Sequence, residues 1–361
     1  VSVCQGLAPD QLPALSMTNT AESPAPLAPL ARTRRLSADV VLYRSGAALA
    51  RRLPQPVGAA LTRAISRTAY RLLPERRFIT ERRLQRVCGP QLQGEALAEA
   101  VRASFESYAR YWYDGARIGD LDDAEVEAGF SHQGFHYIQE AIDTGTAPIL
   151  ALPHLGGWEW AGTWMARIPG YPVISVVEPL KPARLFDWMV EERRRMGIDI
   201  VALGPDAVSV LIKSLRCGQV VCLLADRQVG RGGIEVEFFG ERTLLPGGPA
   251  TLALRTGAAI LPTAVYQDGT SHRGVVLPPV SAERQGRLRE DVTRVTQDLA
   301  SALEQLIRAA PEQWHLMQPN WPSDEDALRS FRQKRRGLDQ QPDLHQQPEQ
   351  IERSPRVRTP G

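Results

Sequence analysis

The sequence contains almost no lysine, although it is rich in basic residues. Lysine and arginine together make up 43 of the 361 residues, and nearly all of these are arginine. The net charge is only +2, but fourteen arginines stand against three acidic residues between Arg32 and Arg86, a local net charge of about +11. A general preference for arginine over lysine does not explain this clustering. The lysines are Lys181, Lys213 and Lys334.

Cysteine and long apolar runs are also scarce. None of the four cysteines forms a CxxC pair, and none is spaced with histidine as in a zinc site, so we expect free thiols in a reducing compartment. No run reaches the roughly 18 apolar residues of a transmembrane helix. The first residues lack the charged start and apolar core of a secretory signal, and we expect neither feature. The cysteines are Cys4, Cys88, Cys217 and Cys222.

Several catalytic signatures are missing. The chain has no GxSxG elbow, no GxxxxGK[ST] phosphate loop and no HExxH zinc motif, and GRGGIE (230–235) is not a dinucleotide fingerprint. Serine hydrolases of the GxSxG type, P-loop enzymes and zincins are therefore disfavoured. We expect no metal site, because only six histidines are present and they show no ligand spacing.

Composition divides the chain into three parts. Residues 1–36 are rich in proline, alanine, serine and threonine and predict a disordered N-terminal extension. Residues 331–361 are polar and end in a proline- and glutamine-rich stretch, which predicts a disordered C-terminal tail. Residues 37–330 predict a single domain, and the 43% hydrophobic content of the whole chain supports a large core.

Short apolar runs alternate with helical patterns from about residue 147 onward, which predicts an α/β fold. We expect a mainly parallel or mixed central sheet with helices on both faces. Upstream, residues 37–72 predict amphipathic helices split at Pro54 and Pro56, and 92–118 predict a further helix. The expected strands are 147–152, 171–177, 198–203, 219–225, 234–239, 258–266 and 273–279. The expected later helices are 157–168, 182–196, 206–216, 248–256 and 288–309.

The stretch LPHLGGWEW (152–160) places His154 between a predicted strand and a predicted helix. Ligands of open α/β sheets bind at the carboxyl ends of strands, and a near-neutral imidazole suits general-base catalysis there. The Gly156–Gly157 step permits a sharp turn and predicts free backbone amides that hold an anion. Position alone still favours a structural histidine, so packed residue, metal ligand and base all remain open at this point.

The spacing from His154 to Glu159 matches the HX4(D/E) motif of glycerolipid and lipid A acyltransferases. Together with ILALPHLGGWEWAG, VEPLKPARLFDWMVEERRRMG, VVCLLADRQVGRGG and WHLMQPNW, it resembles the bacterial lauroyl/myristoyl acyltransferase family, over about residues 36–325. Within that family the resemblance is strongest to actinobacterial members that acylate phosphatidylinositol mannosides. It implies transfer of a long-chain acyl group, such as palmitoyl, from acyl-coenzyme A to a mannose hydroxyl.

The resemblance also implies roles for individual residues. His154 is the expected base, Glu159 the motif acid, and Asp226 an acid that completes a relay with the histidine. Which acid pairs directly with His154 stays open, because the spacing favours Glu159 and the resemblance favours Asp226. The expected substrate-binding residues are Glu178, Arg193 and Arg227. His315 is expected to be structural, Glu235 and Glu237 to face solvent, and LPGGPATLA (245–253) to shape the substrate pocket.

The implied partners are acyl-coenzyme A, a mannosylated phosphatidylinositol and an anionic membrane surface, with no nucleic acid and no cofactor besides the co-substrate. The arginine-rich helices would carry arginine on one face and large apolar residues on the other, which suits a peripheral protein at the cytoplasmic face of the plasma membrane. Two alternatives remain: acylation of another glycolipid, as in lipid A synthesis, and a non-catalytic anionic-lipid-binding protein.

Overall fold

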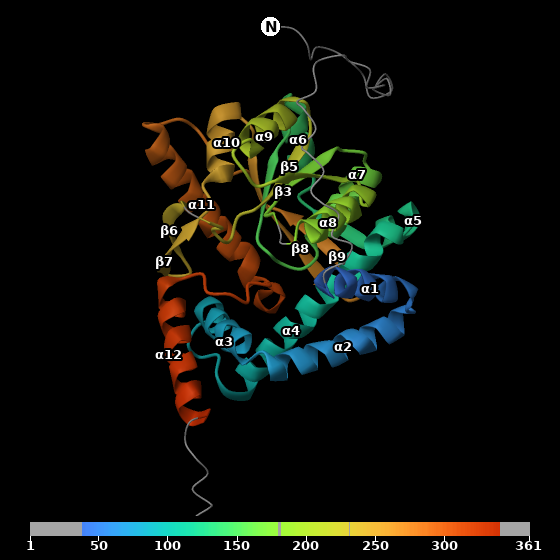
Figure 1. Ribbon diagram of the computed structural model, residues 1–361. Coiled ribbons are helices and arrows are strands. Elements are labelled where there is room, and N and C mark those ends of the chain that lie inside the picture. The colour runs from blue at the N-terminus through green and yellow to red at the C-terminus, as the bar shows by residue number, and fades with distance from the viewer. Residues whose placement is uncertain (1–37, 180–181, 231, 340–361) are drawn as a thin grey trace, which may run out of the picture.

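A seven-stranded mixed sheet forms the centre of the computed structural model, which describes residues 38–179, 182–230 and 232–339 (Figure 1). The strand order is β1-β9-β8-β2-β5-β3-β4. Strands β8, β2, β5, β3 and β4 run parallel, and β9 pairs antiparallel with β8. The expected α/β fold with a mixed sheet is thus confirmed. The strands are β1 (Phe130–Gln133), β2 (Ile149–Leu152), β3 (Val173–Val177), β4 (Ile198–Ala202), β5 (Val220–Leu224), β8 (Ile260–Asp268) and β9 (Ser271–Val276).

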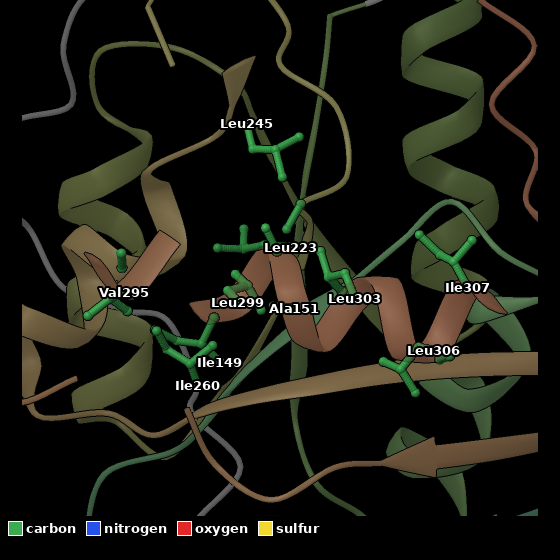
Figure 2. Close-up of a cluster of buried hydrophobic side chains, with 14 of the residues drawn as sticks. Ile149, Ala151, Leu223, Leu245, Ile260, Val295, Leu299, Leu303, Leu306 and Ile307 are labelled. Carbon is green, nitrogen blue, oxygen red and sulfur yellow. The ribbon is translucent and has the colours of Figure 1, made fainter. Parts of the chain in front are cut away.

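Helices cover both faces of this sheet because successive strand residues point to opposite sides. Ile149 and Ala151 of β2 face one core, and Leu150 and Leu152 face the other. Figure 2 shows the first core, where α11 lies across β2, β5 and β8. The covering helices on that side are α9 (Ala207–Arg216), α10 (Gly248–Thr256) and α11 (Leu288–Arg308); on the other side they include α5 (Asp123–Ala128), α6 (His136–Asp143) and α7 (Trp158–Arg167).

Helices α1–α4 gather at one end of the sheet, below it in Figure 1. The α2 helix packs on α4 through small residues one turn apart, and a side chain on Gly58 would overlap the ring of Tyr113. The split of 37–72 into two helices at Pro54 is confirmed. These elements are α1 (Ala38–Arg52), α2 (Gln55–Leu72), α3 (Pro74–Cys88) and α4 (Gly94–Arg117), followed by the short turn η2 (Ile118–Asp120); α8 (Ala183–Arg195) contacts α1.

The C-terminal part differs from expectation. The predicted disordered tail was to begin at 331, but α12 (Pro322–Asp339) continues through that boundary and packs on α3, with Phe331 stacked on Phe78 at 4.6 Å between centroids. Asp324 is buried beneath Arg82 and Arg86, which holds the start of α12 in place. Residues 1–37 and 340–361 lie outside the described residues. A hairpin of β6 (Ile234–Phe238) and β7 (Glu241–Leu245) and the turn η3 (Pro311–Gln313) complete the fold.

Candidate active site

His154 lies on the turn between β2 and α7, and two glycines shape that turn. Gly156 has a φ of +60°, and a side chain on it would collide with the carbonyl oxygen of Val265 in β8. A Cβ on Gly157 would lie 2.7 Å from the ring of His272. Close approach to β8 and to His272 therefore explains both glycines.

The same turn corrects the expected anion site. The Gly156 amide donates to the Gln313 carbonyl at 3.0 Å, and the Gly157 amide donates to the Val265 carbonyl at 3.1 Å. Both N–H groups are thus used by neighbouring backbone. They are not free to hold an anion, because they hydrogen-bond the turn to β8 on one side and to the segment that follows α11 on the other.

Asp226, not Glu159, pairs with His154. The Nδ1 of His154 lies 2.6 Å from Oδ1 of Asp226, and the His154 backbone amide donates to Oδ2 at 3.0 Å. The sheet register produces this contact: Leu152 pairs with Leu224 in adjacent parallel strands, and the histidine and the aspartate each follow two residues later. With Nδ1–H donating to a carboxylate, Nε2 is left as the acceptor of a neutral ring. The His154 side chain is 33% exposed, so the ring can meet a substrate.

The Asp226 carboxylate is fully buried and well supplied with donors. Burial raises its pKa, but the His154 ring, the Trp314 indole and the His154 amide outweigh that effect and leave the pKa below its usual value. The Trp314 Nε1–H donates to Oδ2 at 2.6 Å, and Asn320 donates to the Asp226 carbonyl at 3.0 Å. The carboxylate is therefore held ionised in one orientation.

The segment WHLMQPNW (314–321) completes the site from the far end of the chain. The His315 amide donates to the His154 carbonyl at 2.7 Å, and Leu155 bridges to Trp314. Burial and the charge of Arg83 lower the pKa of the His315 ring to about 3, so it is neutral, and Nε2 is hydrogen bonded to Ser107 at 2.9 Å. These contacts agree with the expected structural role of His315.

Glu159 points away from His154 into a network of its own. Its Oε1 accepts from the Tyr111 hydroxyl at 2.7 Å and from Arg193 at 3.0 Å, and its Oε2 is buried without a hydrogen-bond partner in the described residues. Arg193 also lies over the Trp158 ring, 5.4 Å from its centroid. Of the three adjacent arginines in α8, Arg193 is the one whose side chain turns inward, and its substrate-binding role stays a prediction.

Of the other expected substrate-binding residues, Arg227 lies beside His154 and Glu178 does not. Arg227 follows Asp226, lines the same cavity as His154 and hydrogen-bonds Gln318. Glu178 is exposed beyond β3, lines neither cavity described below, and makes no hydrogen bond or ion pair with the described residues. Its substrate-binding role stays a prediction. Glu235 and Glu237 are exposed on β6, as expected.

Two adjoining cavities lie beside these residues. The reaction cavity, of about 210 Å³, is lined by His154, Trp158, Arg227 and His315. The apolar groove, of about 810 Å³, is lined by α1, α2, α4 and α8. The LPGGPATLA segment, expected to shape the pocket, lines neither, because α10 packs against the sheet core instead. Residues that line both cavities are Arg76, Tyr108, Tyr111, Trp112 and Met317.

Sequence reasoning missed several groups that build the site. Trp314 as a donor to Asp226 and Arg83 beneath the 314–317 segment were not expected, and neither was Tyr111. Arg83 is 1% exposed, donates to the Leu316 carbonyl and to Ser104, and burial lowers its pKa to about 9. The aromatic run SYARYWYDGAR before the motif was the available signal for Tyr111. Across the part of the chain that the structure describes, no group of three histidine, cysteine or acidic side chains is placed to hold a metal.

This arrangement, a base-like histidine held by a buried aspartate beside an apolar groove, is the one an acyl-transferring α/β enzyme needs. The chain belongs to the bacterial lipid A biosynthesis acyltransferase family, whose family model matches residues 31–323. It is 34% identical to the phosphatidylinositol mannoside acyltransferase of Mycolicibacterium smegmatis over 78% of this chain and 91% of that protein. It is 37% identical to the protein of that name from Mycobacterium tuberculosis, over 62% of this chain and 70% of the relative. These comparisons support a glycolipid acyltransferase.

Proposed function

We propose that the protein transfers a long-chain acyl group, such as palmitoyl, from acyl-coenzyme A to a mannose hydroxyl of a phosphatidylinositol mannoside. The observation that carries the proposal is the His154–Asp226 pair, whose histidine lines a reaction cavity that shares wall residues with the apolar groove. The names of the relatives support the acceptor, and the volume and lining of the apolar groove support a long acyl donor.

In this proposal His154 is the general base. Its Nε2 takes the proton from the acceptor hydroxyl as the oxygen attacks the thioester carbon. The carbon–sulfur bond breaks, and the departing thiolate receives the proton from the imidazolium. Asp226 fixes the reactive tautomer and stabilises the imidazolium. This route needs no metal or cofactor besides the co-substrate, and Arg227 is placed to bind an anionic part of the substrates.

The outer face of α1 and α2 suits a lipid surface. Val41 of α1 and Val57 of α2 are 45% and 49% exposed and line neither cavity, and arginines such as Arg63 and Arg67 lie exposed on the same helix pair. The expected separation of arginine from large apolar residues on opposite helix faces is thus only partly observed. Small residues face inward, and large apolar residues face solvent together with arginine. Each such arginine near an anionic surface contributes on the order of 1 kcal/mol. We place the protein peripherally at the cytoplasmic face of the plasma membrane; within the described residues no helix is long and apolar enough to span a bilayer.

The membrane contact is tested by co-sedimentation with phosphatidylinositol-containing vesicles. Binding should weaken steeply as salt rises, and Val57→Asp should weaken it further. Val208→Asp is the matched control, since Val208 is 41% exposed on α9, away from this face. Binding that is independent of salt and of Val57→Asp would contradict the proposed surface.

The reaction is tested with purified protein, radiolabelled palmitoyl-coenzyme A and a panel of acceptors. The wild type should label phosphatidylinositol mannosides, and His154→Ala should abolish labelling while the protein still unfolds cooperatively. Labelling of a lipid A precursor in place of the mannoside would overturn the acceptor. Substantial activity in a folded His154→Ala variant would overturn the mechanism, and lipid binding without any transfer would favour a non-catalytic role.

A further inference from the structure

We infer that Glu159 is a positioning residue that acts through Tyr111 to align the acyl chain, and that it takes no part in proton transfer. The inference rests on the proposed function and deepens it. The shared wall of the two cavities carries the argument, because Tyr111 borders both the apolar groove and the reaction cavity.

Glu159 forms no hydrogen bond or ion pair with His154, the histidine of its own motif. The carboxylate that orients His154 belongs to Asp226, and the only described hydrogen bonds to the Glu159 carboxylate come from Tyr111 and Arg193. Both reach the same oxygen, Oε1, while Oε2 is buried and has no partner in the described residues. A relay acid would have to reach the imidazole, and this one does not.

Tyr111 lies where a chain must pass from the groove to the thioester position. Its ring packs on Trp112, 5.5 Å between centroids at 70°, and on His315, 5.3 Å at 48°. Its hydroxyl has one described partner, Glu159. Burial and the neighbouring carboxylate raise the Tyr111 pKa well above 10, so the phenol stays protonated and donates. The ring is therefore fixed by neighbours on its faces and by Glu159 at its tip.

Arg193 holds the other side of this arrangement. It approaches Oε1 at 3.0 Å from α8, and its side chain, like that of Glu159, is largely buried at 12% and 8% exposed. The pair joins α7 to α8 and keeps the Glu159 carboxylate facing α4. A displacement of the tyrosine ring by about 1 Å would move the thioester relative to His154, and such errors cost on the order of 10²-fold in rate.

The contacts allow an isosteric test. In Glu159→Gln the amide oxygen replaces Oε1 and can still accept from Tyr111 and Arg193, while the amide nitrogen takes the place of Oε2, which has no described donor to repel it. We therefore expect kcat/KM for palmitoyl transfer to fall no more than about threefold. Loss of a proton-relay carboxylate would cost on the order of 10²–10⁴-fold. Because Arg193 loses its counter-charge, the variant will melt at a lower temperature, and the assay is run well below that melting temperature.

Tyr111→Phe removes the hydroxyl and keeps the ring. We expect kcat/KM for palmitoyl-coenzyme A to fall about tenfold, and the preference for palmitoyl over lauroyl donors to flatten. The double variant should match Tyr111→Phe, because the two changes break one connection. The pH–rate profile should be unchanged in all three proteins. Tyr137→Phe, on α6 and outside both cavities, is the matched control and should behave as wild type.

These outcomes separate the inference from the function on which it rests. A wild-type protein inactive with every donor would refute the proposed function and this inference with it. With an active wild type, a loss on the order of 10²-fold in folded Glu159→Gln, or a shift of its pH–rate profile, would show a proton-transfer role. Unchanged chain-length preference in Tyr111→Phe would equally overturn the positioning role.

Discussion

Replacing Asp226 with asparagine should abolish most of the activity while leaving the protein folded, because of where the hydrogen-bond donors around the Asp226 carboxylate lie. Oδ2 accepts from the His154 amide and the Trp314 indole, and Oδ1 faces the imidazole Nδ1. An asparagine must turn its carbonyl oxygen toward the two donors, so its NH₂ group faces Nδ1. The ring then accepts at Nδ1 and carries its proton on Nε2, where it can no longer accept one from the acceptor hydroxyl.

A wrong tautomer of this kind in a histidine–aspartate pair lowers kcat by about 10³–10⁴-fold. Since both donors to Oδ2 keep an acceptor, the free energy of unfolding should change by less than about 2 kcal/mol. The assay is steady-state palmitoyl transfer beside urea unfolding of the same preparation. Asp226→Ala is the matched variant: it should be as inactive, but it leaves two buried donors unpaired and should cost about 1–3 kcal/mol for each.

The reasoning about the tautomer fails if Asp226→Asn keeps more than about a tenth of the wild-type kcat. It also fails if asparagine destabilises the protein as much as alanine does, because the carbonyl oxygen would then not occupy the Oδ2 position.

Three further predictions concern stability. Gly156→Ala should lower the free energy of unfolding by about 3 kcal/mol or more, seen in thermal melts, because the φ of +60° and the Val265 carbonyl leave no room for a Cβ; near-wild-type melting would contradict this close approach. The pKa of His315 is about 3 in the folded protein and about 6.5 in the unfolded chain, so the unfolded chain binds the proton first as the pH falls. The stability that the neutral His315 ring contributes is therefore complete above about pH 6.5 and is lost toward pH 3, by at most about 1.4 kcal/mol per pH unit. Urea midpoints of His315→Asn should fall less steeply in that window than those of wild type, and equal slopes would refute the burial argument. Asp324→Ala should cost about 1.5–3 kcal/mol by removing the buried carboxylate that Arg82 and Arg86 share, although Arg86 keeps its pairing with Glu241, while the folded protein keeps its kcat; a change below about 0.5 kcal/mol would show that this cluster does not hold α12.

The alternation of strands and helices in the central region could be predicted because its strands are short, apolar and buried on both faces. The elements that escaped prediction lack such a pattern. In α3 the buried side chains include Arg83 and Thr80, so the helix shows no apolar stripe, and α12 is similarly polar. β1 has only four residues and exposes three of them.

Within the site, the residue types could be predicted but not their pairing. His154 and Asp226 each follow a predicted strand, whereas Glu159 lies in the predicted helix after the first of these strands, and only the strand order decides which acid meets the histidine. That β2 and β5 are neighbours, in the register Leu152 to Leu224, is a property of the assembled sheet. The fate of the glycine amides could not be predicted either, because one acceptor, the Gln313 carbonyl, lies far along the chain.

The contacts of the 314–321 segment make the site depend on three distant parts of the chain. The site combines His154, which follows β2, with Asp226, which follows β5 and lies 72 residues later in the chain. The Trp314 indole, which donates to Asp226, lies another 88 residues on. Without this segment, the histidine and the aspartate could still meet, but the carboxylate would lack the indole and the His154 carbonyl would lack its donor. The geometry of the site is therefore complete only when the end of the domain lies against its middle. A chain that ended before Trp314 would keep the histidine and the aspartate but would lose the contacts that hold both of them in place.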